Sequence, residues 1–229
     1  MPEPRDHLVL SLDVDDLDTA LAVARPLEPW FATVKVGYQL YAAEGPAALE
    51  ALRDNGFYVF ADLKLHDIPN TVEQGARNLA RRGVSFLNFH AAGGVDMLRA
   101  GIAGLHAGAS DAGVEAPISL AVTVLTSDPD TSALVARLDI ARDAGCEGVV
   151  CAGADVPIAR QHALRTMVPG IRFAGGDVHD QARVDTPGDA IARGADWLVI
   201  GRAVTAADEP EIAAVEVTRA VADALANAS

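Results

Sequence analysis

Short apolar segments recur along the chain, separated by stretches in which apolar and polar residues alternate at helical spacing. Each segment is rich in β-branched residues and apolar at nearly every position, which is typical of a strand buried on both faces of a parallel sheet. Eight such segments are expected to be strands: residues 8–13, 33–37, 58–64, 85–91, 118–125, 148–151, 167–172 and 197–202.

The stretches between these strands carry the signals of helices. Residues 70–83 begin with residues that cap helices and end at Gly83, and residues 186–195 have Pro187 in the expected first turn. Further helices are expected at 45–56, at 131–145, and from about Glu211 to the C-terminus.

Strand and helix alternate through the whole chain without a linker, which predicts an α/β protein with one (β/α)₈ TIM barrel over residues 1–229. The length suits this fold, because such barrels usually take about 200–250 residues as one domain. An open, doubly wound sheet is the alternative. It would usually carry a GxGxxG-type turn after the first strand, and here that turn reads LDVDDLD.

Composition and charge narrow the classes of function. The chain has 18 basic and 32 acidic residues and a net charge of −14, which disfavours binding to nucleic acid or to an anionic membrane. No apolar stretch approaches the ~20 residues of a membrane span, and no signal peptide opens the sequence. Cys146 and Cys151 are expected to be buried free thiols. The sequence therefore predicts a soluble cytoplasmic protein.

Polar residues gather at the expected carboxyl ends of the strands. Active sites of (β/α)₈ barrels form at these ends and in the loops that follow them. The residues that this rule brings together are Asp13, Lys35, Asp62, Lys64, Asn88, His90, Thr123, Thr126, Arg172, Gly201 and Arg202.

The most unusual stretch is FADLKLHDIPNT at residues 60–71, which places three charges in an apolar, strand-like context. Alternation along a strand points Asp62 and Lys64 the same way. Lys35, on the neighbouring strand, is able to join them, and Asp67 follows in the loop. Because the attraction within a buried ion pair seldom offsets its desolvation, a purely structural role explains the cluster poorly.

A lysine flanked by carboxylates suits particular chemistry. Opposite charges favour its protonated form, which rules against a Schiff-base nucleophile and favours a general acid or a stabilising cation. A fixed carboxylate beside it would repel an anionic group on a substrate. This combination suits loss of CO₂ followed by protonation of a carbanion. Lys35 and Lys64 are the only lysines among the 18 basic residues, and lysine exchanges its proton where arginine does not.

DLKLHDIPNT resembles the signature of the orotidine 5′-phosphate decarboxylase family. Other segments resemble that family in the same order along nearly the whole chain: LSLD, VKVG, NFHAAGG, AVTVLTS, PGIR and IGRAVT. The DxKxxD core alone is shared with a wider superfamily of sugar-phosphate lyases, whereas the longer set of segments is much more specific.

The resemblance implies a charged network of Lys35, Asp62, Lys64 and Asp67, and it implies no metal or organic cofactor. Lys64 would donate the proton to C6 of the pyrimidine, and Asp62 would lie near the substrate carboxylate. Asp67 would act in the active site of the neighbouring subunit of a homodimer, with Thr71 nearby.

Further contacts follow from the same resemblance. Asp13 and Lys35 would contact the ribose, and Thr126 the pyrimidine region. The phosphate side would be bound by Gln181, Gly201 and Arg202, with Arg172 nearby. Barrels often bind phosphate in the loops after the seventh and eighth strands, which gives this assignment a separate physical basis.

Two alternative functions stay open at this point. A sugar-phosphate lyase of the same superfamily would hold Mg²⁺ with carboxylates such as Asp62 and Asp67, although Lys64 between them would compete with the metal. A non-catalytic nucleotide-binding barrel is the second alternative. His66 and His90 suggest a metal site, but hydrogen-bonded structural histidines are the better interpretation.

Overall fold

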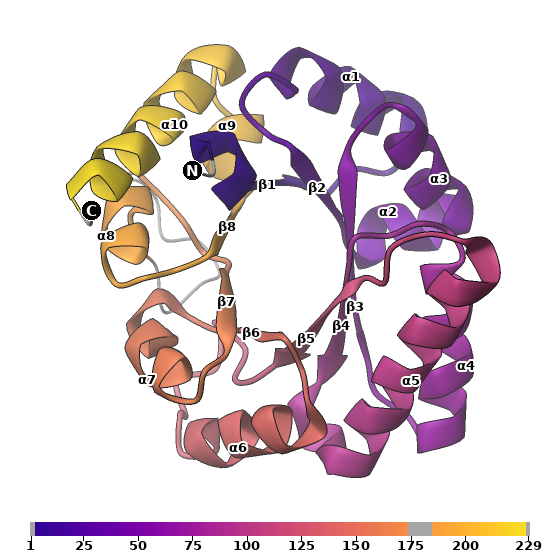
Figure 1. The fold of residues 1–229 in the computed structure, drawn as a ribbon. Helices are drawn as coiled ribbons and strands as arrows, with labels where there is room; N and C mark the ends of the chain where they lie inside the picture. Colours follow the sequence, from indigo (N-terminus) through magenta and orange to yellow (C-terminus); the bar gives the residue numbers. More distant parts are fainter. Residues whose placement is uncertain (1–2, 174–184, 228–229) are drawn as a thin grey trace.

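Eight parallel strands close into a barrel in a computed structural model that describes residues 3–173 and 185–227 (Figure 1). Each strand pairs with the next along the chain, and the last pairs with the first, which confirms the expected TIM barrel. The strands are β1 (Leu8–Leu12), β2 (Thr33–Val36), β3 (Tyr58–Leu65), β4 (Phe86–His90), β5 (Ile118–Val122), β6 (Gly148–Val150), β7 (Arg165–Val168) and β8 (Trp197–Ile200).

Helices form the outer ring around these strands (Figure 1). The α-helices are α1 (Leu17–Leu27), α2 (Tyr38–Glu44), α3 (Pro46–Asp54), α4 (Pro69–Ala80), α5 (Gly94–Ala112), α6 (Leu134–Ala144), α7 (Val156–Gln161), α8 (Pro187–Ala192), α9 (Arg202–Thr205) and α10 (Pro210–Asn227). Short 3₁₀ helices lie at η1 (Pro4–His7), η2 (Ala91–Gly93) and η3 (Gly153–Asp155).

Two apolar cores hold the barrel together. The larger lies between the strands and the helices, and the smaller fills the interior of the barrel. Alternate residues of the strands supply the inner core, as expected where strand side chains point in turn to opposite faces. Its members are Val9, Phe60, Phe86, Leu120, Val122, Val150, Met167 and Val199. Residues one or two positions further along several strands therefore reach the carboxyl end of the barrel.

The long helix α5 was not among the expected helices, and its glycines explain why. Glycine is a poor helix former, so Gly104 and Gly108 weaken the helical signal. A Cβ atom at either position would lie 2.2 Å from a backbone oxygen of α4, that of Glu73 or Arg77 respectively. The glycines let the two helices approach closely, so tertiary packing rather than local propensity stabilises α5.

The seventh strand begins and ends earlier than the sequence indicated. It covers Arg165–Val168 instead of 167–172, because Pro169 has no backbone N–H to continue the ladder and Gly170 takes a positive φ of 81°. The PGIR segment therefore forms the start of the loop, and Arg172 lies in that loop rather than at the end of the strand.

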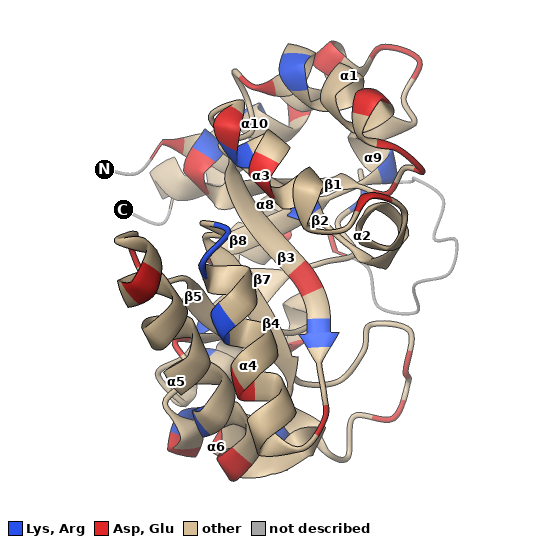
Figure 2. Cartoon of the chain, turned by 90° about the vertical axis from the view of Figure 1, so that its right-hand side faces the viewer, with Lys and Arg blue, Asp and Glu red and all other residues tan. Residues whose placement is uncertain are grey.

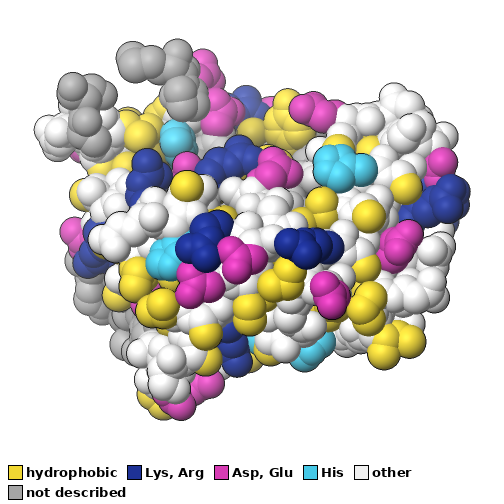
Figure 3. Space-filling model, turned by 60° about the horizontal axis from the view of Figure 1, so that its bottom comes forward, with side chains coloured by type: hydrophobic (Ala, Val, Ile, Leu, Met, Phe, Trp, Pro, Cys, Tyr) yellow, Lys and Arg dark blue, Asp and Glu magenta, His cyan; other side chains and the backbone are white. Residues whose placement is uncertain are grey.

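The two ends of the barrel differ in character. Figure 2 shows the chain termini at one end, while β3 runs towards the other with an acidic and a basic band near its tip. Those bands correspond to Asp62 and Lys64, the charged residues of β3. Elsewhere basic side chains lie next to acidic ones, as on the face in Figure 3. No helix in the described part of the chain is long and apolar enough to cross a membrane.

Candidate active site

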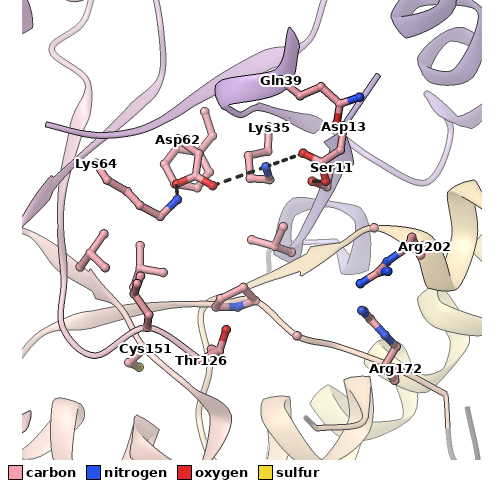
Figure 4. A pocket seen from close by; sticks show the side chains of 18 of the residues that line it. Ser11, Asp13, Lys35, Gln39, Asp62, Lys64, Thr126, Cys151, Arg172 and Arg202 are labelled. Carbon is pink, nitrogen blue, oxygen red and sulfur yellow. Dashed lines mark hydrogen bonds and ion pairs between the residues drawn. The ribbon is translucent and has the colours of Figure 1, made fainter. Parts of the chain in front are cut away.

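A cavity of about 510 Å³ opens at the carboxyl end of the barrel (Figure 4). Its floor is apolar, with Phe60, Val122 and Val199 among the lining residues, and its walls carry charged groups from several strands and loops. The polar residues that line it include Ser11, Asp13, Lys35, Gln39, Asp62, Lys64, Thr126, Arg172, Arg202 and Thr205.

Four charged side chains form a row along one wall of this cavity (Figure 4). The Nζ atom of Lys35 lies 3.2 Å from Oδ1 of Asp13 and 3.4 Å from Oδ2 of Asp62. The Nζ atom of Lys64 lies 2.5 Å from Oδ1 of Asp62. The sequence-based expectation that Asp62, Lys64 and Lys35 meet is thus confirmed, and the signs of the charges alternate along the row.

Asp62 lies between the two lysines of this row, and its carboxyl group stays ionised. Burial of its carboxyl group by itself raises the pKa, but the charges of Lys35 and Lys64 and the hydrogen bonds from Lys64 and Asn88 outweigh that effect. The pKa of Asp62 therefore lies below its usual value of 3.8. A negative charge is held in the cavity wall at every pH near neutrality.

This lowered pKa predicts how stability depends on acid. A carboxyl group whose pKa is lower in the folded chain stabilises the fold above its unfolded value of 3.8, and this contribution is lost as the pH falls through the folded value. We expect the free energy of unfolding to fall below about pH 4 and to fall less steeply in Asp62→Asn. Urea titrations at several pH values measure both slopes, with Asp208→Asn as the control for net charge. Equal slopes for the wild type and Asp62→Asn would contradict this.

Strand β3 is irregular where it carries the charges. Its pairing with β4 shifts between Ala61 and Leu65, so the regular alternation assumed from the sequence does not continue through Lys64. A side chain bonds to the backbone in this irregular part: the Leu63 carbonyl accepts a hydrogen bond of 2.7 Å from the hydroxyl of Tyr38. The ring of Tyr38 also lies 6.0 Å from Nζ of Lys64.

Sequence reasoning missed Ser11, which forms a hydrogen bond to Asp13 at one end of the row. Its buried hydroxyl donates a 2.7 Å hydrogen bond to Oδ2 of Asp13 and so helps to orient that carboxylate towards Lys35. Ser11 is in β1, two positions before Asp13, which directly follows the end of the strand. That spacing is the signal that could have found it.

Two arginines lie together at the opposite end of the cavity from Lys64 (Figure 4). Arg172 comes from the loop after β7, and Arg202 is the first residue of α9, directly after Gly201. Thr126, from the loop after β5, lies between the two ends. The end of the cavity with the two arginines suits a phosphate group, since one guanidinium group donates two parallel hydrogen bonds to phosphate oxygens. Gln181, the remaining residue expected there, lies outside the described residues.

Asp67 and Thr71 do not line this cavity. Asp67 is exposed in the loop after β3, where its carboxylate accepts a 2.6 Å hydrogen bond from the backbone N–H of Ile68. Thr71 is exposed in the first turn of α4, and Ile68 between them is 66% exposed. Within one chain these two residues are therefore separate from the row of charges.

His66 and His90 stack on each other with ring centroids 5.5 Å apart. The Nδ1 atom of His90 accepts a hydrogen bond from the backbone N–H of Ala92. Burial, together with the positive charge of Arg137, lowers the pKa of His90. Its ring is thus neutral at neutral pH. No group of three metal-ligating side chains forms within residues 3–173 and 185–227.

Comparisons with known proteins point to one family. The family described as orotidine 5′-phosphate decarboxylase / HUMPS matches residues 6–217. The chain is 42% identical over 226 residues to an orotidine 5′-phosphate decarboxylase of Moorella thermoacetica, covering 92% of this chain and 90% of that relative. It is 40% identical over 227 residues to the enzyme of the same description from a Geobacillus species, covering 92% and 94%.

Solved structures agree on the fold. A crystal structure of orotidine 5′-phosphate decarboxylase from Lactobacillus acidophilus superposes with a TM-score of 0.82 at 31% sequence identity, covering 93% of this chain and 98% of that one. A structure described as an uncharacterized conserved protein from Geobacillus kaustophilus gives a TM-score of 0.80 at 32% identity, covering 93% and 99%.

Proposed function

The chain belongs to the orotidine 5′-phosphate decarboxylase / HUMPS family, and we propose that its barrel mouth decarboxylates orotidine 5′-phosphate with Lys64 as the proton donor. The enzyme is a carboxy-lyase that forms uridine 5′-phosphate in pyrimidine biosynthesis. The observation that carries the proposed mechanism is the separation of two groups of charged side chains in the cavity. Asp62 and Lys64 lie at one end, and the two arginines lie at the other.

This separation orients the substrate. The phosphate binds between Arg172, Arg202 and the backbone at Gly201, which places the pyrimidine towards Lys64. Thr126 contacts the pyrimidine region, and Asp13 and Lys35 bind the ribose hydroxyls. Gln181 completes the phosphate side in this proposal.

The carboxylate of the substrate then lies beside Asp62. Because the pKa of Asp62 is lowered, its negative charge persists and repels the substrate carboxylate, an interaction that disappears as CO₂ leaves. The C6–carboxyl bond breaks and its electron pair stays on C6. The ammonium group of Lys64, 2.5 Å from Asp62, supplies a proton to that position and regains one from solvent.

We place Asp67 and Thr71 in the active site of a second subunit of a homodimer. Both are exposed and outside the cavity of their own chain. Large apolar side chains are exposed nearby in sequence and at neighbouring strand ends, namely Tyr38, Ile68 and Leu125. These features support a partner subunit that covers this rim and receives Asp67. We place the enzyme in the cytoplasm, since both cysteines are buried free thiols.

The proposed reaction needs no metal, and chelation tests it directly. We expect purified enzyme to decarboxylate orotidine 5′-phosphate at the same rate with and without EDTA, because Lys64 and Asp62 supply the charges that a divalent cation supplies in the alternative lyase. A spectrophotometric assay follows the loss of the substrate. Activity that disappears on chelation and returns with added Mg²⁺ would refute the metal-free mechanism, and no turnover at all would favour a non-catalytic nucleotide-binding barrel.

A further inference from the structure

Asn88 of β4 lies opposite the irregular part of β3. Ala61 pairs with Leu87 and Leu65 pairs with Phe89, so three residues of β3 stand where β4 has Asn88 alone. Such a bulge leaves backbone groups without ladder partners and re-aims the side chains of the bulged strand. The bulged residues here include both Asp62 and Lys64.

The side chain of Asn88 is fully buried and bonds to both of these residues. Its Oδ1 atom accepts a 2.7 Å hydrogen bond from the backbone N–H of Lys64. Its Nδ2 atom donates a 2.7 Å hydrogen bond to Oδ1 of Asp62, the oxygen that also receives Nζ of Lys64. A backbone N–H only donates and a carboxylate only accepts, so the amide fits in one orientation.

The backbone of Lys64 needs such support because its φ is 46°. A residue with a Cβ atom is disfavoured in this left-handed region, and the conformation persists only where the surroundings determine it. The bond from Lys64 N–H to Asn88 holds the residue at this φ. A different φ at Lys64 would change the direction in which its side chain leaves the bulge, and with it the position of Nζ relative to Asp62.

We propose that Asn88 is a positioning residue for the decarboxylation, which holds Lys64 in its left-handed conformation and Asp62 in a fixed orientation. The inference rests on the proposed role of Lys64 and adds a residue that acts through it. Asn88 does not line the cavity, so it influences the reaction through Asp62 and Lys64 rather than by touching the substrate.

Two substitutions separate positioning from mere packing. Asn88→Leu removes both hydrogen bonds, and we expect kcat to fall ~10²-fold with KM changed less than about 3-fold, because small misplacement of catalytic groups has effects of this size. Asn88→Asp keeps the acceptor for Lys64 N–H but sets a second carboxyl group against Asp62. The two groups then share a proton at low pH and repel each other at high pH.

The pH profile of Asn88→Asp is therefore diagnostic. The protonated carboxyl group donates to Asp62 as the amide does, so the ratio of variant to wild-type kcat should rise as the pH falls from about 8 to about 5. Thr166→Val is the matched control. Thr166 is also fully buried and bonded to Asp196, outside the cavity, so its loss affects stability and leaves kcat and the pH profile unchanged.

Steady-state kinetics on orotidine 5′-phosphate, with folding checked by circular dichroism, decide the proposal. A folded Asn88→Leu enzyme with kcat within about 3-fold of wild type overturns it. If the leucine variant does not fold, Asn88→Asp decides alone, and a ratio that is flat with pH overturns the proposal. Wild type and Lys64→Ala run beside them. If wild type is inactive, or Lys64→Ala active, the proposed mechanism fails first; if both behave as proposed, a failure concerns Asn88 alone.

Discussion

Lys64→Ala is expected to lower kcat for decarboxylation by up to ~10⁴-fold while the barrel stays folded, because the variant lacks the group that protonates C6. Lys64 contributes one side of an ion pair with Asp62, and Lys35 still balances that carboxylate from 3.4 Å away. Circular dichroism and thermal unfolding check the fold, and the spectrophotometric assay measures turnover. Near-normal turnover in this variant would refute the role of proton donor.

Lys64→Arg is the matched control for charge. It keeps a cation beside Asp62 but does not give up a proton, so it should also be inactive. Binding of uridine 5′-phosphate, measured by calorimetry, separates chemistry from binding. Both variants retain Arg172 and Arg202 at the other end of the cavity and are expected to bind the product. Substantial activity in Lys64→Arg would mean that charge alone, not proton transfer, is what Lys64 supplies.

Mixing Lys64→Ala with Asp67→Ala, each inactive alone, is expected to restore about one quarter of wild-type activity per subunit. In a symmetric dimer that shares its sites, half of the dimers are hybrids after exchange, and each hybrid holds one site with both residues intact. The physical reason is the placement of Asp67, which is exposed and outside the cavity of its own chain. The activity is followed over time while subunits exchange.

The double variant Lys64→Ala/Asp67→Ala provides the matched control. Mixed equally with wild type, it should lower activity from half to about one quarter, since hybrids then contain no intact site. Subunit exchange is confirmed with two tagged chains. If Asp67 serves its own chain, the first mixture stays inactive and the second stays at half, which would count against a shared site.

Several elements of this protein follow from local sequence alone. The β-branched segments determined the eight strands and their order, because fully apolar runs bury both faces in a parallel sheet. The rule that barrel chemistry sits at the carboxyl strand ends then placed Lys35, Asp62 and Lys64 at one mouth, and the cavity there is lined by all three. The chain's two lysines, Lys35 and Lys64, both lie in the charged row.

Other features depended on contacts between distant segments. Helix α5 escaped detection because Gly104 and Gly108 lower its intrinsic propensity, and the packing against α4 that stabilises it is invisible in a single segment. The irregularity of β3 was not predicted from the sequence, for a related reason. Its cause is the register with β4, and a register is a property of two strands.

The sequence by itself determined the barrel, the mouth that carries the chemistry and the charged groups gathered there, because periodicity and residue type are local properties. Only the tertiary structure decided how those side chains are oriented. Their orientation depends on the bulge at Lys64, on the φ of 46° at that residue, and on the hydrogen bonds made by Asn88 and Ser11. The tertiary structure also decided that Asp67 lies outside its own cavity. The orientation of these side chains depends on strand register and on hydrogen bonds between residues far apart in the chain. Local sequence patterns do not encode either of these.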